Sequence, residues 1–377
     1  MTTPAPVEPP PRCWAEVDLG ALRDNADLLA KQAGPACGLM AIVKADAYGH
    51  GLPEVVAALA GRVGWFGVAN FREARRARKA VGEHRAEFLI LSPAAPEEVE
   101  SVVADGFSGS VSLPEEVEAY AAAAEKQGAI ARLHAVVDTG MGRMGAQADD
   151  FPGLVERIRR DPFCRLEGIA SHFPSADEDE DFTRDQIARF RSLLEAVKPE
   201  PGCHIHLGNS AGLLGFQNEM PFVTLARPGL ALYGISPLAT AGVDLQPVLS
   251  LKTRVTLVRD LPAGAGVSYG RTFVTDRPTR VATLAAGYGD GYPRHLSGRG
   301  ASVLLGGKRC PILGRVTMDQ VLVDVSAIDG VNRGDEAVLI GRQGDGEITV
   351  AEIAEKAETI PWEILTGITS RVVRVYR

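Results

Sequence analysis

Short β-rich runs alternate with amphipathic stretches over the first two-thirds of the chain. In the amphipathic stretches, apolar residues recur at the three- to four-residue spacing of a helix. Strands are expected at Gly38–Val43, Trp65–Ala69, Phe88–Leu91, Gly109–Val111, Leu133–Asp138, Leu166–Ser171, Cys203–Leu207 and Phe222–Leu225. Helices are expected at Leu52–Ala60, Phe71–Ala80, Pro96–Ala104, Pro114–Lys126, Phe151–Arg160, Phe182–Val197 and Ser210–Phe216. Eight strands, each followed by a helix or a tight turn, predict an α/β fold, a closed parallel (β/α)8 barrel of the TIM type.

The pattern changes after about Asp244, where β-branched segments become closely spaced. Strands are expected at Leu249–Leu261, Arg280–Leu284, Ala301–Leu305, Gln320–Val325 and Glu336–Ile340, with turn dipeptides such as Asp345-Gly346 between them. One helix is expected at Val350–Ala357, with Thr349 as its N-cap and Glu352 three residues later. This pattern predicts a mostly antiparallel β domain at the C-terminus.

Length and pattern together predict two domains. A chain of 377 residues is long for one hydrophobic core, and a barrel of about 250 residues leaves room for a smaller domain. We expect a disordered leader over residues 1–11, a barrel over 12–244 and a β-rich domain over 245–377. Packing of the first strand, 12–18, with the C-terminal domain stays open. The leader is rich in Thr and Pro and has no apolar segment of the kind found in signal peptides.

Composition argues against several classes of protein. Apolar residues make up 45% and charged residues 23% of the chain, as in ordinary globular enzymes. A net charge of −8 and the lack of a basic tract with aromatics argue against nucleic acid as a partner. No apolar stretch reaches the roughly 18 residues that a membrane helix needs. The five cysteines are scattered without a Cys-x-x-Cys pair, which favours reduced thiols in a cytoplasmic protein over disulfides or a zinc site.

Lys44 is the first candidate for chemistry. It closes the apolar run Leu39–Val43, and a lysine at the end of a barrel strand lies at the face where barrel enzymes hold their active sites. Apolar walls disfavour the ammonium form, which lowers the lysine pKa and frees the amine for Schiff-base chemistry. Tyr48, Gly49 and Gly51 add a phenol and the close backbone approach that an anion site needs. A surface lysine at a strand end is the alternative that position alone leaves open.

The segment Ala41–Gly51, AIVKADAYGHG, resembles the cofactor-attachment motif of alanine racemases. The opening segment Trp14–Leu19, with Leu22 and Asn25, is also similar to that family, and the resemblance continues to the C-terminus. Related barrel decarboxylases share only the lysine that ends a strand. The resemblance implies that Lys44 binds pyridoxal 5'-phosphate as a Schiff base and removes the α-proton from one enantiomer of the substrate.

A second motif, Gly266–Gly270 (GVSYG), carries Tyr269. Racemisation needs acid–base groups on opposite faces of the substrate carbanion, because one removes the α-proton and the other returns it. A phenol becomes a useful base where a network of cations lowers its pKa. From the residue alone, a tyrosine in a glycine-rich β turn is the simpler interpretation. The resemblance implies that Tyr269 is the second catalytic group and that it reaches the site from the partner subunit of a homodimer.

Arg227 and His172 each follow an expected strand. Arg227, in the segment Leu225–Gly229, resembles the family's partner for the pyridine nitrogen, and His172 matches the histidine between that arginine and the tyrosine. A guanidinium cannot give up its proton, so the pyridine nitrogen stays unprotonated and the ring withdraws electrons weakly. A short-lived carbanion then favours return of the proton to Cα over transamination. The alternatives are a surface arginine before a turn and a structural histidine.

The resemblance implies further contacts with cofactor and substrate. Phosphate contacts are expected from Asn209, Ser210, Gly229, Leu230 and Tyr48. Ser210 opens a short helix, where free N–H groups and a hydroxyl suit an anion. Arg143, in the run DTGMGRMG, is expected to contact the cofactor's phenolic oxygen and the substrate carboxylate. The backbone N–H of Met318 is expected at the same carboxylate, and Tyr288 at the inner gate of the site.

Two positions depart from the family pattern. Many members carry a carbamylated lysine two residues before the run that begins at Asp138, and here that position is Val136. We therefore expect another anion or a rearranged partner to hold Arg143, and activity that does not respond to bicarbonate. Trp362 stands where the family usually has a tyrosine beside the phosphate, and it is expected to contact the cofactor there. An indole donates but does not accept a hydrogen bond, so the grip on phosphate and the preferred substrate size are both in question.

The expected function is alanine racemisation, an isomerase reaction that would supply D-alanine for peptidoglycan in a bacterium. A serine or broad-specificity racemase and an amino-acid decarboxylase of the same fold remain alternatives. A decarboxylase does not need a base on each face, so Tyr269 favours racemisation. A non-catalytic pyridoxal-phosphate carrier is a further alternative, but small barrel carriers lack a second domain. The sequence has no dinucleotide-binding motif, no P-loop and no metal motif, and the acidic run Asp177–Asp181 is interpreted as a solvated loop.

Overall fold

The computed structural model describes residues 10–238 and 242–377. The described chain forms two compact units. A barrel unit comprises Leu19–Ala47 and Gly51–Gln246, and a β-rich unit comprises the residues up to Asp18, Tyr48–His50 and Pro247–Arg377. Residues 1–9 of the expected leader lie outside the described residues.

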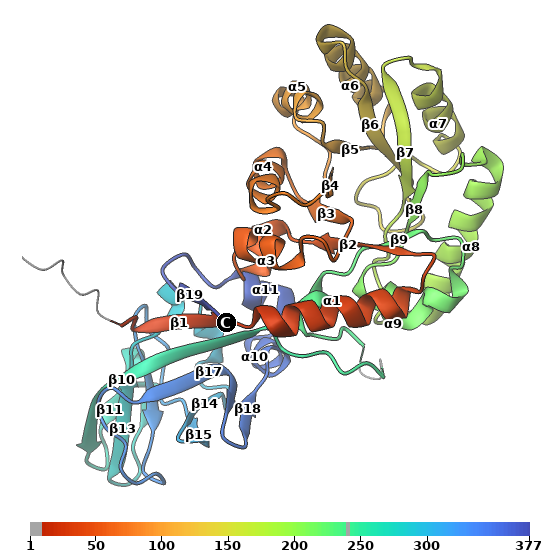
Figure 1. Ribbon diagram of the computed structural model, residues 1–377. Coiled ribbons are helices and arrows are strands. Elements are labelled where there is room, and N and C mark those ends of the chain that lie inside the picture. The colour runs from red at the N-terminus through yellow and green to blue at the C-terminus, as the bar shows by residue number, and fades with distance from the viewer. Residues whose placement is uncertain (1–9, 239–241) are drawn as a thin grey trace, which may run out of the picture. The chain divides into compact units, whose positions relative to one another are not determined.

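Eight parallel strands form the barrel unit over its described residues (Figure 1). They are β2 (Gly38–Ile42), β3 (Trp65–Val68), β4 (Glu87–Ile90), β5 (Ser108–Val111), β6 (Ala131–Val136), β7 (Cys164–Ala170), β8 (His204–His206) and β9 (Leu225–Ala226). Neighbours pair in chain order from β2 to β8, and β9 pairs with β2. Two backbone bonds close the ring between β8 and β9: Thr224 N–H to Ile205 O at 2.9 Å and Arg227 N–H to Gly208 O at 3.0 Å. The predicted (β/α)8 barrel is confirmed.

Helices alternate with these strands (Figure 1). They are α1 (Leu19–Ala33), α3 (Leu52–Leu59), α4 (Phe71–Ala80), α5 (Pro96–Ala104), α6 (Pro114–Gln127), α7 (Phe151–Arg160), α8 (Glu180–Val197) and α9 (Ser210–Phe216). Asn70 and Asp179 cap α4 and α8 by accepting a backbone N–H at 3.0 Å, and a proline opens α5 and α6. The apolar face of each helix is buried, as with Leu154, Val155 and Ile158 of α7.

The last barrel strand is shifted from its expected place. The sequence pattern placed it at Phe222–Leu225, whereas β9 is Leu225–Ala226, because pairing with β2 begins with Gly38 opposite Leu225. Thr224 instead makes two hydrogen bonds with Ile205. Its N–H donates to the Ile205 carbonyl, and its Oγ1 accepts the Ile205 N–H at 2.9 Å. Closure of the barrel thus uses a side chain where a regular strand would use backbone alone.

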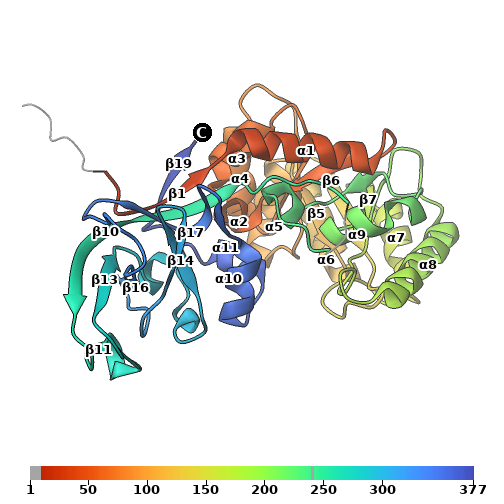
Figure 2. The ribbon, with the colours of Figure 1, turned by 90° about the horizontal axis from the view of Figure 1, so that it is seen from below.

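The β-rich unit is built around one mainly antiparallel sheet (Figure 2). Its strands are β1 (Cys13–Val17), β10 (Leu249–Leu261), β13 (Thr279–Leu284), β14 (Ser302–Leu305), β15 (Lys308–Pro311), β16 (Val321–Asp324), β17 (Glu336–Gln343), β18 (Gly346–Ile348) and β19 (Val373–Tyr376). A separate hairpin pairs β11 (Gly266–Val267) with β12 (Phe273–Val274). Strand β1 pairs antiparallel with β10 and parallel with β19, so the first strand of the chain belongs to this sheet.

Two helices accompany the sheet, α10 (Val350–Ala357) and α11 (Pro361–Thr366). Thr349 caps α10 as predicted, since its Oγ1 accepts the Glu352 N–H at 3.0 Å. The five cysteines of the chain are free thiols. Among the described residues we find no helix with the length and apolar character that crossing a membrane requires.

Candidate active site

Lys44 lies at the carboxyl end of β2, directly after Val43, whose N–H donates to Gly67 O at 2.9 Å. The chain then makes a left-handed turn, α2 (Lys44–Tyr48), with φ between 52° and 55° at the four non-glycine residues 45–48. Each L-residue in this conformation costs about 1–2 kcal/mol relative to a right-handed helix. Such a turn persists only where its surroundings fix it.

Glu73, in the first turn of α4, fixes this turn. Its Oε1 accepts the N–H of Ala45 and its Oε2 accepts the N–H of Ala69, both at 2.9 Å. The Glu73 backbone is held in turn by the cap residue Asn70, whose side chain accepts the Glu73 N–H at 3.0 Å. One carboxylate therefore ties the residue after Lys44 to the end of the next strand, and the lysine leaves the barrel in one defined direction.

The side chain of Lys44 is half-buried at this end of the barrel. Burial lowers its pKa, and so do the positive charges of Arg143 and Arg227, while the Glu73 carboxylate opposes them. A lower pKa leaves more of the lysine as the neutral amine, the form that attacks a carbonyl carbon and accepts a proton. The environment suits the chemistry expected of Lys44.

Arg227 follows β9 and is 6% exposed. Its Nη1 donates to His206 Nδ1 at 2.8 Å, and its Nη2 donates to His172 Nδ1 at 3.0 Å. Nη2 also donates to the carbonyl oxygens of Ser171 and Leu207 at 2.8 and 3.2 Å. The guanidinium is therefore held by partners from the ends of two neighbouring strands, β7 and β8.

Electrostatics fix the protonation of Arg227 and His172. Burial and the charge of Arg143 lower the pKa of Arg227 to about 10, which leaves the guanidinium charged at neutral pH. Burial, Arg227, Arg143 and Lys44 all lower the pKa of His172 well below its ordinary value, so the imidazole is neutral. Because an arginine only donates, His172 Nδ1 is the acceptor, and the ring proton lies on Nε2. His172 thus carries one N–H that does not face Arg227.

Ser210 joins two segments that were expected to bind phosphate. Its Oγ accepts the N–H of Gly229 at 3.0 Å and of Ala231 at 3.2 Å. These bonds link the start of α9 to the start of the 3-10 helix Leu230–Tyr233. Asn209 caps α9 with its side chain. The structure thus brings the two predicted segments together, and their helix starts and the serine hydroxyl provide donors for an anion.

Arg143 is exposed in a turn that Asp138 organises. The Asp138 carboxylate accepts the N–H groups of residues 140–142, each at 2.8 Å. Val136 is buried in β6. Within residues 10–238 and 242–377 no carboxylate forms an ion pair with the Arg143 guanidinium. The position of the Arg143 backbone is therefore set by the hydrogen-bonded turn that precedes it.

In the β-rich unit, Tyr48 is buried, and burial raises the pKa of its phenol to about 12. The next residue, Gly49, touches α11, because an added Cβ would overlap the Leu365 carbonyl oxygen. Arg374 Nε donates to the Gly49 carbonyl at 3.0 Å and fixes the same segment. Trp362 lies half-buried in the first turn of α11. Tyr48 and Trp362 therefore come from neighbouring segments of this unit.

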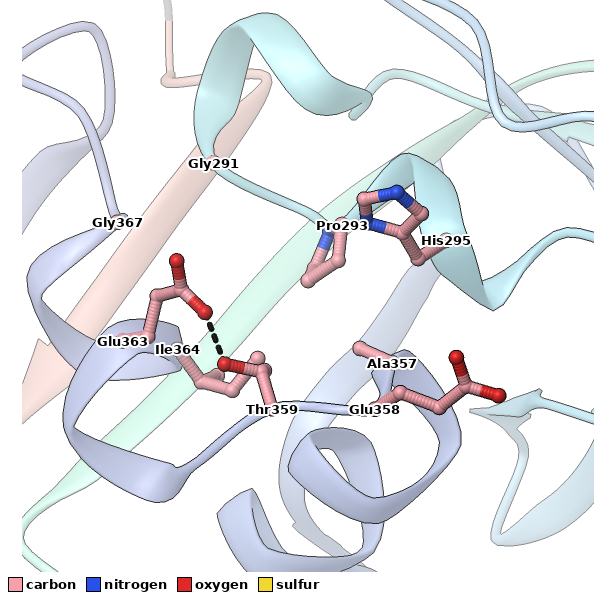
Figure 3. Close-up of a pocket in the computed structure, with 9 residues that line it drawn as sticks. All are labelled: Gly291, Pro293, His295, Ala357, Glu358, Thr359, Glu363, Ile364 and Gly367. Atoms are coloured by element: carbon pink, nitrogen blue, oxygen red, sulfur yellow. Dashed lines mark hydrogen bonds between the residues drawn. The ribbon is translucent and has the colours of Figure 1, made fainter.

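A pocket of 350 Å³ opens beside α10 and α11 (Figure 3). It is lined by Gly291, Pro293, His295, Ala357, Glu358, Thr359, Glu363, Ile364 and Gly367. The Thr359 hydroxyl donates to the Glu363 carboxylate there. None of the site residues expected from the sequence is among the described residues that line this pocket, so it lies outside the predicted catalytic set.

Tyr269 opens a short 3-10 helix in a sharply bent turn. The backbone has a positive φ on both sides of it, 62° at Ser268 and 72° at Gly270. Ser268 Oγ donates to the Arg315 carbonyl at 2.6 Å, which ties the turn to the neighbouring segment. The Tyr269 side chain is nevertheless 70% exposed. A fixed backbone therefore presents a phenol that the described residues of its own unit leave largely uncovered.

Tyr288 and Met318 lie on adjacent turns of the same unit. The Tyr288 N–H donates to the Thr317 carbonyl at 3.0 Å. An added Cβ at Gly287 would overlap the same carbonyl oxygen, so the glycine permits this close approach. The side chains of Tyr288 and Met318 are 41% and 52% exposed.

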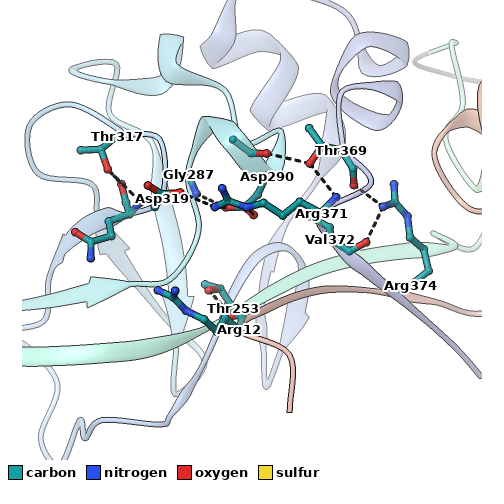
Figure 4. A network of polar contacts seen from close by, with 12 residues as sticks. Arg12, Thr253, Gly287, Asp290, Thr317, Asp319, Thr369, Arg371, Val372 and Arg374 are labelled. Atoms are coloured by element: carbon teal, nitrogen blue, oxygen red, sulfur yellow. Dashed lines mark hydrogen bonds and ion pairs between the residues drawn. The ribbon is translucent and has the colours of Figure 1, made fainter. Parts of the chain in front are cut away.

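Arg371, whose side chain is about half exposed, connects these two turns by ion pairs with Asp290 and Asp319 (Figure 4). Its Nε donates to Asp290 Oδ1 at 2.7 Å, and its Nη2 pairs with Asp319 Oδ1 at 2.8 Å. Asp290 is 3% exposed and also accepts the Gly287 N–H at 2.9 Å. Arg371 thus ties together the turns that carry Tyr288 and Met318, and Asp319, although more than half exposed, is one of its two carboxylate partners.

Comparison with known proteins decides the family. The family model described as the N-terminal domain of alanine racemase matches residues 17–237, and the C-terminal domain model matches residues 248–376. The chain belongs to the alanine racemase family. Members of this family are pyridoxal-phosphate-dependent racemases, so the chain is an enzyme of that class, and the resemblance drawn from its motifs is confirmed.

Full-length relatives support the same assignment. The alanine racemase of Symbiobacterium thermophilum is 41% identical over 372 residues, covering 96% of each chain. That of Halothermothrix orenii is 38% identical over 370 residues, covering 97% of this chain and 96% of the relative. The solved alanine racemase from D-cycloserine-producing Streptomyces lavendulae has a TM-score of 0.90 at 37% identity and covers 98% of both chains. The Bacillus anthracis structure with bound L-Ala-P has a TM-score of 0.88 at 34% identity, covering 99% of this chain and 96% of that one.

The barrel residues of this alanine racemase family member fit pyridoxal phosphate by their own chemistry. Lys44 has the lowered pKa that a Schiff-base lysine needs. Arg227 is buried, charged and only able to donate, which suits an acceptor ring nitrogen. The Ser210 hydroxyl hydrogen and the N–H of Leu230, which Ser210 Oγ does not accept, suit a phosphate.

Three residues around the family site were missed by sequence reasoning: Glu73, His206 and His134. The spacing Asn70-x-x-Glu73 is typical of a capped helix start, and it could have drawn attention to Glu73 from the sequence alone. His206 lies three residues before Asn209 at the end of an expected strand, so its proximity to the phosphate segment was visible. His134 lies within an apolar strand and carried no signal, because only the folded barrel brings it to His206.

Proposed function

We propose that this family member interconverts L- and D-alanine with pyridoxal 5'-phosphate attached to Lys44. One observation carries the proposal: an amine of lowered pKa and a buried, donor-only arginine stand at the ends of neighbouring strands β2 and β9. The cofactor supplies an electrophilic carbon for the substrate amine and a ring that withdraws electrons from Cα. In a bacterial host, we further propose, the D-alanine serves peptidoglycan synthesis in the cytoplasm.

Lys44 is proposed to remove and return the α-proton on one face of the substrate, since its neutral amine is favoured by burial and by two nearby cations. Arg227 donates to the ring nitrogen without giving up a proton, which keeps the ring a weak electron sink. Proton return to Cα is then fast, and racemisation wins over transamination. The four fixed bonds of Arg227 keep it in place for this task.

The remaining groups are proposed to bind and orient. Phosphate is proposed to bind at Ser210, Asn209, Gly229 and Leu230, which the Ser210 hydrogen bonds bring together. Tyr48 and Trp362 are added to this set because the family resemblance implies it. Arg143 pairs with the substrate carboxylate, because the Asp138 turn leaves its guanidinium without a carboxylate among the described residues. Met318 offers its N–H to the same carboxylate, and Tyr288 lines the way in.

The second base is proposed to come from a second copy of the chain, in a homodimer. Tyr269, Tyr288 and Met318 are 70%, 41% and 52% exposed, although their backbones are fixed. Exposed side chains on rigid turns are expected where another subunit covers them. His172 supports this role for Tyr269, because its Nε2–H can donate to a phenolate oxygen and favour the base form.

Chiral separation of the products tests the proposal. The purified protein with pyridoxal phosphate should convert either pure enantiomer of alanine into the racemate, and borohydride should attach the cofactor to Lys44. Lys44→Ala should lose about 10³-fold or more in rate. Lys79→Ala, at the far end of α4, should retain it. Release of CO2 or an adduct on another residue would exclude the assignment, and faster turnover of serine would identify a racemase of broader range.

A further inference from the structure

A chain of buried polar side chains leads from Arg227 into the barrel interior. Arg227 Nη1 donates to His206 Nδ1 at 2.8 Å, and His206 Nε2 lies 2.7 Å from His134 Nδ1. His134 Nε2 lies 3.5 Å from Glu167 Oε2. His206 and His134 are 1% and 0% exposed. These contacts therefore connect Arg227, the residue proposed to face the cofactor ring, with the carboxylate of Glu167 on β7. Glu167 lies four residues before Ser171, which is about 13 Å along the strand.

The donors in this chain all point the same way. Arg227 only donates, so His206 Nδ1 must accept. Burial, and then the charge of Arg227, lower the pKa of His206 well below its ordinary value, and burial also lowers that of His134. Both imidazoles are therefore neutral and carry one proton each. With Nδ1 as the acceptor in both rings, that proton lies on Nε2, and the His134 proton points to Glu167.

The Glu167 carboxylate is the ionised end of the chain. Burial by itself raises the pKa of Glu167, but the nearby His134 N–H, the hydrogen bond from Ser108 and the charge of Arg132 bring it down to about 2. Ser108 Oγ donates to the same oxygen, Oε2, that His134 approaches. His134 Nε2 makes no hydrogen bond among the described residues, and the Glu167 carboxylate, 3.5 Å away, is the acceptor that its N–H faces.

Two irregularities of β7 make room for the chain. The pairing of β6 and β7 passes from Leu133 opposite Leu166 to His134 opposite Gly168, so Glu167 is the extra residue of a β-bulge. A bulge re-aims a side chain at the expense of ladder bonds. At Gly168, an added Cβ would overlap the His134 imidazole. Both features cost sheet stability, and both place Glu167 and His134 in contact.

We propose that Glu167 is a positioning residue for Arg227, acting through His134 and His206. A carboxylate at this point accepts the His134 proton and so selects one tautomer in both imidazoles. If the tautomers reversed, His206 would present an N–H to the Arg227 N–H groups, two donors would face each other, and the guanidinium would have to turn away. The effect on the reaction rests on the proposed role of Arg227, whereas the tautomer assignment does not.

Nitrogen NMR of the full chain tests the tautomers directly. The protein has seven histidines, so selective ¹⁵N labelling gives few signals, and ¹⁵N shifts separate a protonated ring nitrogen from an acceptor. His206 and His134 are expected as neutral rings with the proton on Nε2. A proton on Nδ1 of either ring, or a charged imidazolium at neutral pH, would overturn the proposal.

Glu167→Gln tests the carboxylate, with Glu87→Gln as the matched control. Both carboxylates contact Arg132, but only Glu167 reaches His134. Glu167→Gln should change the His134 and His206 signals and lower kcat about 10- to 100-fold with little change in KM. Glu87→Gln should leave both signals and kcat as in the wild type.

A third variant keeps the test decisive if Glu167→Gln does not fold. Glu167→Asp retains the charge but moves it away from His134 by one methylene, and an intermediate loss of kcat is expected. Wild-type signals and wild-type kcat in whichever of the two variants folds would contradict the proposal. A wild type with the expected tautomers but no racemase activity would refute the proposed function and leave the tautomer assignment intact.

Discussion

The two units of this chain prepare their site residues in opposite ways. In the barrel unit, Arg227 is 6% exposed and makes four hydrogen bonds, and Ser210 is 4% exposed with two. In the β-rich unit, Tyr269 is 70% exposed and Met318 52%, although hydrogen bonds fix the turns that carry them. The barrel therefore holds its groups by direct contact, whereas the β-rich unit fixes backbone and leaves side chains uncovered.

This difference distinguishes site residues whose contacts are completed within one chain from site residues that remain available to a partner subunit. Buried donors are placed at high cost and need internal acceptors, which Arg227 finds in the strand ends around it. An exposed phenol needs no internal hydrogen-bond partner, because water supplies one. It can act as a catalytic base only when another surface covers it and forms the site around it. The comparison predicts that changes in the β-rich unit affect catalysis without affecting the barrel, and that acid weakens the barrel through its buried imidazoles.

The largest effect is expected from Tyr269→Phe. Loss of the second base should lower kcat/KM by about 10²–10⁴-fold. The loss must be equal in both directions, because the two enantiomers have the same free energy. In D2O, however, the variant should exchange the α-proton of one enantiomer without inversion, since Lys44 still removes and returns a proton on its own face. NMR of the recovered alanine measures exchange, and chiral separation measures inversion.

Tyr376→Phe serves as the control for this variant, since Tyr376 lies in β19 of the same unit and outside the proposed site. It should racemise at the wild-type rate. If Tyr269→Phe exchanged both enantiomers at equal rates, or kept wild-type racemisation, the division of labour between the two units would be wrong.

Acid should act on the barrel next most strongly. The pKa values of His134 and His206 are lowered in the folded chain, so above pH 6.5 these imidazoles are neutral in both folded and unfolded states. As pH falls below 6.5, the unfolded state binds protons that the folded state does not. Stability should then fall by up to about 2.7 kcal/mol per pH unit for the two groups. Urea unfolding at a series of pH values measures this slope.

Tryptophan fluorescence can assign this loss to one unit. Trp65 packs edge-on against His134 at 5.4 Å between ring centroids, and it lies in the barrel, whereas Trp14 lies in the β-rich sheet. With Trp362 replaced by Phe, single-tryptophan variants should show the steeper pH dependence in the Trp65 signal. An identical slope in both reporters would mean that the two units unfold together and would remove this distinction.

The barrel was predictable from sequence because its signals are local. Apolar periodicity and strand-end positions such as Lys44 are each read from residues that lie within a few positions of one another. The segments around Ser210 and Gly229 could also be singled out, since their motifs are contiguous, and the structure brings them together. Their mutual hydrogen bond could not be derived, because it depends on barrel closure through the shifted strand β9.

Long-range polar contacts escaped the sequence for a physical reason. Glu167 looks like an ordinary charged residue of a strand, and its inward direction follows only from the bulge opposite Leu133 and His134. The left-handed turn after Lys44 escaped as well, since the alanines on both sides of Asp46 have no preference for positive φ. Tertiary bonds such as that from Ala45 to Glu73 override local preference there.

Mixing the two halves of the proposed site should give a smaller but decisive effect. In a heterodimer of Lys44→Ala with Tyr269→Phe, one site has both bases and the other has neither, if each site takes its tyrosine from the other copy. Such heterodimers, purified through two different tags, should recover about half of the wild-type activity per dimer. Recovery should be absent if each chain uses its own tyrosine, and that result would place the site within one copy.

The smallest expected effect is none at all, and it concerns the Arg143 turn. Val136 is buried in β6 and has no amine to carbamylate, while the Asp138 carboxylate already binds three backbone N–H groups of the turn at 2.8 Å. Adding bicarbonate to carbon-dioxide-free buffer should therefore leave the rate of racemisation unchanged. Asp138→Asn, which keeps the shape but replaces one acceptor oxygen by a donor, should raise KM because the turn loosens and Arg143 binds the substrate carboxylate less well. A rate that rose with bicarbonate would mean that an anion from solution occupies the place next to Arg143, and that the barrel unit, like the β-rich unit, leaves part of its site to be completed from outside.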